Sequence, residues 1–138
     1  MPFTWNENYS VGVKIFDDQH RRYIDIANQI DALSMQDGVN QEKILMSLIE
    51  FSNYAALHFS SEETYFEEYK FPGSELHVAE HNRYREKIKE FLARAQSPNA
   101  DVKKIAHELA DFAVDWLLRH VISMDKHYTD FFNARGIK

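Results

Sequence analysis

No cysteine occurs among the 138 residues of the chain. Its absence excludes disulfide bonds, metal sites built from thiolates and enzymes that use a thiol nucleophile. Iron–sulfur clusters with cysteine ligands are excluded for the same reason. Any reactive or metal-binding site must therefore be sought among the other polar side chains.

Glycine and proline are scarce, with four and three residues respectively. So few of them leave little material for the many tight turns of a β-sandwich or a β-barrel. The hydrophobic and charged fractions, 44% and 28%, are those of an ordinary folded globule. A chain of this length suits one hydrophobic core. We therefore expect a mostly helical protein with one domain over residues 1–138.

Long apolar and basic stretches are also missing. The longest segments without a charge, such as Phe51–Ser61, are far too short to span a bilayer. The first ten residues are polar and lack the pattern of a signal peptide. The formal net charge is −6, and basic residues gather only in short pairs. These features predict a cytoplasmic protein that binds neither membranes nor nucleic acid.

Apolar residues recur at helical spacing in four segments, at about 17–36, 41–70, 74–96 and 101–134. Residues 1–16 show no such period, and we interpret them as an ordered arm because its aromatic residues need a surface to pack against. The expected N-terminal capping residues are Asp17 or Asp18, Asn40, Ser74, and Asn99 or Asp101. Four helices joined by short loops predict an all-α, up-down-up-down four-helix bundle.

Polar residues occupy several inward positions where apolar ones are expected. They are His20 in the first helix, His58 and Glu62 in the second, His77 and His81 in the third, and His120 and Asp125 in the fourth. An ionised carboxylate buried alone costs several kcal/mol or more, and each unpaired imidazole adds to that cost. Something must therefore satisfy these groups. The other polar runs are interpreted as solvated faces: His107, His127, Glu63, Glu67, Glu68 and the pair Arg21–Arg22.

The spacing of His120 and Asp125 is awkward for a regular helix. Five residues correspond to about 140° around an ideal helix axis, so the two side chains would not share a face. If both point into the core, we expect a local distortion of the fourth helix, such as a π-bulge.

Five imidazoles and two carboxylates are too many ligands for one metal ion. Two ions bridged by both carboxylates would use them all, and a bridging oxo or hydroxo group would complete six bonds at one ion and five at the other. The second ion would keep one open position for a small ligand. The ligand types alone also suit zinc, copper or nickel.

These residues, in this order, resemble the hemerythrin family, most closely its single-domain bacterial members. The resemblance covers nearly the whole chain. It rests on Trp5, Tyr9-Ser10-Val11-Gly12-Val13, Phe16-Asp17, Gln19-His20, His58-Phe59, Glu62-Glu63, Phe71-Pro72, His77, His81, Trp116-Leu117, His120-Val121 and Asp125-Lys126. It implies a four-helix bundle with two non-haem iron ions, joined by a bridging oxo or hydroxo group, that bind dioxygen reversibly.

The resemblance also implies a role for each of these ligands. His77, His81 and His120 would hold one iron, His20 and His58 the other, and Glu62 and Asp125 would bridge them. Oxygen would bind at the iron held by His20 and His58. Phe59, Trp116 and Leu117 match positions that line the oxygen pocket in the family.

Tyr23 departs from the family, where the corresponding residue is usually aliphatic. Its hydroxyl either points away into a hydrogen bond or reaches the oxygen site. In the second case it would stabilise the bound ligand or speed its loss by protonation.

The resemblance leaves three classes of function to consider. The first is carriage, storage or buffering of dioxygen. The second is sensing of oxygen or redox state through a protein partner, whose identity the sequence does not give. The third is an oxidative di-iron enzyme, which is the least favoured, because ferritin-like catalytic bundles use Glu-x-x-His motifs and this sequence has none. We therefore expect a protein that is not an enzyme.

Overall fold

The computed structural model describes residues 3–138 and confirms an all-α four-helix bundle. The long helices are α1 (Lys14–Ser34), α2 (Gln41–Tyr69), α3 (Ser74–Gln96) and α4 (Val102–Ser123). Shorter pieces are η1 (Glu7–Tyr9), η2 (Asp125–Tyr128) and α5 (Thr129–Asn133). No strand occurs between residues 3 and 138, and no helix in that range is both long and apolar enough to cross a membrane.

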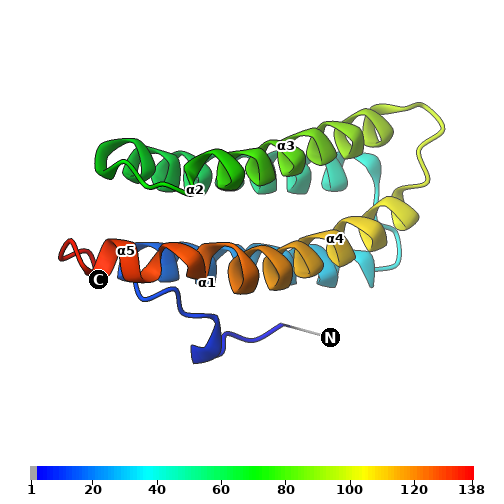
Figure 1. Ribbon diagram of the computed structural model, residues 1–138. Coiled ribbons are helices and arrows are strands. Elements are labelled where there is room, and N and C mark those ends of the chain that lie inside the picture. The colour runs from blue at the N-terminus through cyan, green and yellow to red at the C-terminus, as the bar shows by residue number, and fades with distance from the viewer. Residues whose placement is uncertain (1–2) are drawn as a thin grey trace.

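The helices form two layers, with α2 and α3 in one and α1 and α4 in the other (Figure 1). Each helix contacts its neighbour in the chain, and α1 also packs against α4, which closes the bundle. This is the expected up-down-up-down arrangement. The apolar core runs along its axis, from Val11 and Phe132 at one end to Leu109 and Ala95 at the other.

The capping predictions are partly right. Asn40 and Asp101 cap α2 and α4, because their side-chain oxygens accept hydrogen bonds from the amides of Lys43 and Lys104. The other two predictions are wrong: α1 begins at Lys14, before Asp17, and the Ser74 side chain makes no capping hydrogen bond at the start of α3. The predicted arm therefore ends three residues earlier, and its first two residues lie outside the described range.

The arm is held against α1 and α5. Asp17 is buried, and its carboxylate accepts hydrogen bonds from the amide of Val11 and the hydroxyl of Ser10, at 2.8 and 2.6 Å. Gly12 has a left-handed φ of +69°, and a Cβ there would lie 2.7 Å from a side-chain carbon of Thr129. The arm thus closes the end of the bundle where α1 starts.

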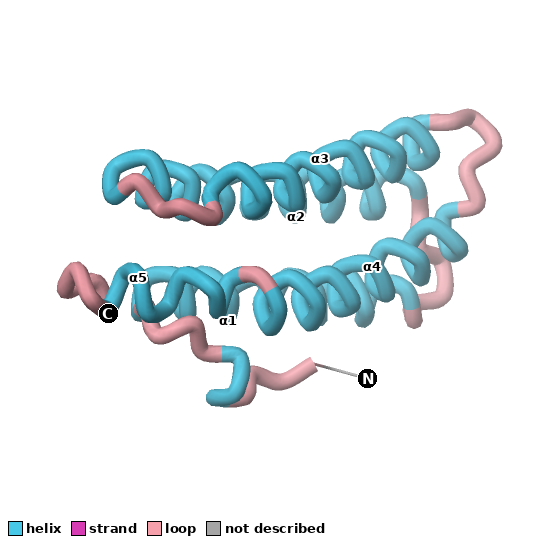
Figure 2. Tube along the Cα trace, in the orientation of Figure 1, coloured by secondary structure: helices cyan, strands magenta, loops and turns pink. Residues whose placement is uncertain are grey.

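The expected distortion between His120 and Asp125 is present, but it is not a π-bulge. Helix α4 ends at Ser123, where a short loop interrupts the helical path (Figure 2). The chain continues as the tighter 3₁₀ turn η2 before α5 starts. The amide of His127 bonds the carbonyl of Met124 three residues back, which is the 3₁₀ pattern. Breaking the helix, rather than widening it, turns Asp125 into the core, where it is fully buried.

Candidate metal centre

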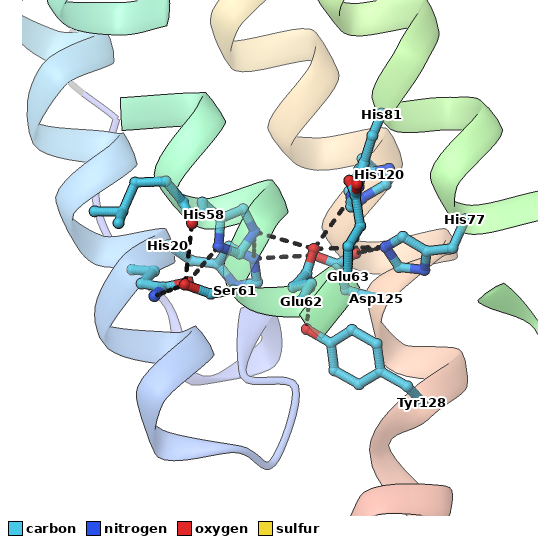
Figure 3. A network of polar contacts seen from close by, with 12 residues as sticks. His20, His58, Ser61, Glu62, Glu63, His77, His81, His120, Asp125 and Tyr128 are labelled. Carbon is cyan, nitrogen blue, oxygen red and sulfur yellow. Dashed lines mark hydrogen bonds and ion pairs between the residues drawn. The ribbon is translucent and has the colours of Figure 1, made fainter. Parts of the chain in front are cut away.

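The seven polar side chains predicted to face the core lie together in the middle of the bundle (Figure 3). They come from α1 (His20), α2 (His58, Glu62), α3 (His77, His81), α4 (His120) and η2 (Asp125). None of them is more than 3% exposed. The four helices therefore build one dry, polar cluster inside an apolar core.

The cluster contains two overlapping groups of possible metal ligands among the described residues. Glu62, His77, His81 and His120 form the first, and His20, His58, Glu62 and Asp125 form the second. In each group the ligand atoms lie within 4.8 Å of one another. Because Glu62 belongs to both groups, the arrangement offers two neighbouring cation positions that share a carboxylate.

Both carboxylates face the two groups at once. The Oε1 atom of Glu62 lies 3.2 Å from Nε2 of His81 and 3.3 Å from Nε2 of His58. One oxygen of Asp125 lies 2.7 Å from Nε2 of His120, and its other oxygen lies 2.9 Å from Nε2 of His20. Each carboxylate is thus placed to bridge a cation of one group to a cation of the other.

The atoms that face the cluster centre fit a bound cation. Glu62 Oε1, both oxygens of Asp125 and the Nε2 atoms of His77, His81 and His120 make no hydrogen bond of good geometry within residues 3–138. Buried polar atoms almost always have a partner, so this many together indicate a missing one. Imidazole nitrogen and carboxylate oxygen are suitable ligands for iron and for several other transition metals.

The electrostatics of the cluster agree with this fit. Burial alone would raise the pKa of Glu62, but His58, His77 and His81 together hold that pKa well below its ordinary value. Burial likewise opposes the charge on His77, yet the carboxylates of Asp125 and Glu62 close to its ring raise the pKa of His77 to about 10. Without a cation, protons on the imidazoles therefore balance the negative charge of the carboxylates. A cation would take their place, so metal binding should release protons.

A second layer of residues orients these side chains, and the sequence did not reveal it. His58 Nδ1 lies 2.6 Å from Oε1 of Gln19, and His81 Nδ1 lies 2.7 Å from Oε2 of Glu63. The Tyr128 hydroxyl donates a hydrogen bond of 2.5 Å to Oε2 of Glu62. The prediction that Glu63 lies on a solvated face is therefore wrong, whereas Glu67, Glu68, Arg21, Arg22, His107 and His127 are exposed as expected.

A simple signal could have revealed Gln19 and Glu63. Each is next in sequence to a cluster residue, and neighbours on a helix point about 100° apart. Such a residue cannot reach the same point as its neighbour, but it can reach a residue of the adjacent helix. Gln19 on α1 does so with His58 on α2, and Glu63 on α2 does so with His81 on α3.

Two of the residues predicted to line an oxygen pocket, Phe59 and Trp116, stack directly on cluster histidines. The Phe59 ring stacks on His81 with centroids 4.0 Å apart, and the Trp116 ring stacks on His120 at 4.1 Å. Leu117 is buried in the next position of α4. Tyr23 packs on the side of Trp116, with ring centroids 5.9 Å apart. The aromatic rings of Phe59 and Trp116 thus cover two of the cluster histidines.

The Tyr23 hydroxyl makes a hydrogen bond with the backbone. It donates to the carbonyl of Ala113 on α4, at 2.9 Å. Burial raises the pKa of this phenol, so it stays protonated at physiological pH. Of the two orientations that the sequence left open, the structure has the one in which the hydroxyl is committed to a hydrogen bond.

Comparison with known proteins gives consistent matches. The model of the family described as hemerythrin HHE cation binding domain matches residues 11–131. A bacteriohemerythrin of Clostridium acetobutylicum is 29% identical over 130 residues, which cover 93% of this chain and 99% of that protein. A bacteriohemerythrin of Methylococcus capsulatus is 26% identical over 126 residues, covering 91% and 92%. A crystal structure of wild-type hemerythrin matches with a TM-score of 0.84 at 24% identity, covering 94% of this chain and 97% of the other.

Proposed function

The chain belongs to the hemerythrin family, and from that membership we propose that it binds dioxygen reversibly at two non-haem iron ions. In this role it carries, stores or buffers dioxygen in the cytoplasm. The observation that supports the proposal most is the pair of overlapping ligand groups that share Glu62. One group has three histidines and the other has two. If each carboxylate gives one oxygen to each cation, the cation held by two histidines has one protein ligand fewer than the other. That position is where dioxygen would enter.

The protein residues have distinct roles in this proposal. Five histidines and two carboxylates hold the two cations, and Phe59, Trp116 and Leu117 keep water out. Iron, when bound, supplies the electrons that dioxygen binding needs. Gln19, Glu63 and Tyr128 fix the orientation of their partners, as groups behind metal ligands generally do.

We propose a binding role rather than a catalytic one. A general base must be free to take a proton from a substrate. Both carboxylates of the cluster are enclosed by imidazoles, and Glu62 in addition accepts a hydrogen bond from the Tyr128 hydroxyl. Neither is therefore available as a base for a second molecule.

The test is an iron count combined with optical spectroscopy. Protein reduced without air should contain two irons per chain. Admission of air should produce a visible charge-transfer band, and removal of air should abolish it over repeated cycles. Metal-free protein is the control and should show no band. A chain that holds no iron, or iron without any response to oxygen, would overturn the proposal.

A second candidate is sensing of oxygen or redox state through a protein partner. One chain of contacts favours it: the half-buried Tyr54 donates a hydrogen bond of 2.8 Å to the backbone carbonyl of Gln19, whose side chain in turn holds His58. A change at His58 can thus reach the outer surface of α2. A band that appears once and then decays to a stable oxidised spectrum would favour sensing over carriage.

Tyr23→Phe is expected to leave oxygen release nearly unchanged. Its hydroxyl is bound to the Ala113 carbonyl, so its removal should alter the release rate by no more than about twofold while lowering the free energy of unfolding by about 1 kcal/mol. Stopped-flow release of oxygen and denaturant unfolding measure the two effects. A tenfold change in the release rate would show that the hydroxyl reaches the bound ligand.

A further inference from the structure

One histidine in each ligand group has its outer nitrogen held by a side chain of an adjacent helix, and the two partners differ. In the group with three histidines, His81 Nδ1 faces a carboxylate, that of Glu63, at 2.7 Å. In the group with two histidines, His58 Nδ1 faces a neutral amide, that of Gln19, at 2.6 Å. The distances are nearly equal, so the difference between the two contacts is one of charge.

The carboxylate of Glu63 has a second partner. The same oxygen, Oε2, accepts a hydrogen bond of 2.9 Å from the guanidinium of Arg85 on α3. That guanidinium also lies over the ring of Phe59, 5.1 Å from its centroid, and Phe59 stacks on His81. Glu63 and Arg85 are partly shielded from solvent, with side chains 26% and 33% exposed. The three side chains therefore form a line, Arg85–Glu63–His81, from the surface to the cluster.

We propose that Glu63 and Arg85 are positioning residues that set how strongly His81 donates electrons to the cation it binds. A carboxylate behind a metal-bound histidine fixes the ring and makes it a stronger donor. Stronger donation favours the oxidised metal. Arg85 draws charge from the same oxygen and so moderates the effect. The inference rests on the proposed iron site and adds a difference between its two positions: the position held by His77, His81 and His120 favours oxidation more.

A structural role for this pair makes a different prediction. Partly exposed ion pairs contribute little to stability, and losing either partner of such a pair has the same kind of effect. An electronic role requires opposite effects. Removing the charge of Glu63 should favour the reduced centre, whereas removing the charge of Arg85 should favour the oxidised centre.

The experiment is a spectroelectrochemical titration of the iron-loaded, full-length protein and its variants. Glu63→Gln keeps the shape and an acceptor oxygen, so His81 would be held as His58 now is. At a fixed potential we expect the ratio of reduced to oxidised centre to rise about tenfold, which is about 59 mV for a one-electron step. Arg85→Leu should lower the ratio by a smaller factor, and Arg85→Lys, which keeps the charge, should restore it toward that of the unmodified protein.

Two exposed residues give matched controls. Glu67→Gln removes the same charge one turn further along α2, and Arg83→Leu removes an arginine from α3 two residues before Arg85. Neither should shift the titration. If Glu63→Gln behaves like Glu67→Gln, or if the Glu63 and Arg85 variants shift the titration in the same direction, the inference is wrong.

The reverse change tests the inference from the other side. Gln19→Glu places a carboxylate behind His58, and we expect the ratio of reduced to oxidised centre to fall. This variant keeps the test decisive if Glu63→Gln does not retain iron. Two irons per chain with no shift in Gln19→Glu and Arg85→Leu would overturn this inference alone. An unmodified protein without iron would overturn the proposed function and this inference with it.

Discussion

Glu62→Ala is expected to remove most of the metal from the protein. Glu62 is the one residue that belongs to both ligand groups, and its Oε1 faces His58 on one side and His81 on the other. Loss of a residue that only supports a ligand typically weakens metal binding about 10- to 100-fold, so loss of a shared ligand should cost more than about 100-fold. Iron counted per chain after dialysis should fall from two to well below one.

Glu62→Gln separates the charge of Glu62 from its shape. The amide oxygen can still accept the hydrogen bond of Tyr128, which alanine leaves buried without an acceptor at a cost of about 1–3 kcal/mol. We expect Glu62→Gln to fold as stably as the unmodified chain without metal, yet to bind iron poorly. Glu67→Ala, an exposed change on the same helix, should keep two irons. Full occupancy of both positions in Glu62→Ala would show that Glu62 does not bridge.

The fold and the cluster were predictable because helical periodicity leaves few choices. Residues four apart on a helix share a face, so His58 with Glu62 and His77 with His81 had to point the same way. Once four inward faces each carried polar groups, closing the bundle had to bring them together. The core lies where the apolar period placed it, since burial of that face is what makes the helices pack.

The features that the sequence did not reveal depend on how neighbouring helices pack, and not on the spacing of residues along a single helix. Glu63 has the composition and the neighbours of a solvated residue, and its contact with His81 depends on how α2 and α3 pack. The break after Ser123 is similar: the spacing of His120 and Asp125 required a distortion, but both a widened and a tightened turn could supply it. In the structure the tightened turn holds Tyr128 close to Glu62, and its hydroxyl donates a hydrogen bond to that carboxylate.

His58→Ala is expected to abolish oxygen binding. His58 is one of the two histidines in the group with one protein ligand fewer, so its loss leaves His20 as the only imidazole there. The group with His77, His81 and His120 keeps all three histidines, so part of the iron should remain. The visible band should no longer follow the admission and removal of air. Optical titration with oxygen, on protein reduced without air, measures this directly.

Three comparisons make the His58 result specific. Gln19→Ala leaves His58 in place and removes the partner of its Nδ1, together with the hydrogen bond from Gln19 to Ser61, so it should weaken metal binding or oxygen affinity about 10- to 100-fold without abolishing it. His127→Ala, at an exposed histidine, should behave like the unmodified protein. Imidazole added to His58→Ala can enter the space left by the ring, and partial return of the band would show that the missing ligand, and not a folding defect, caused the loss. Unchanged oxygenation of His58→Ala would place the oxygen site elsewhere in the bundle.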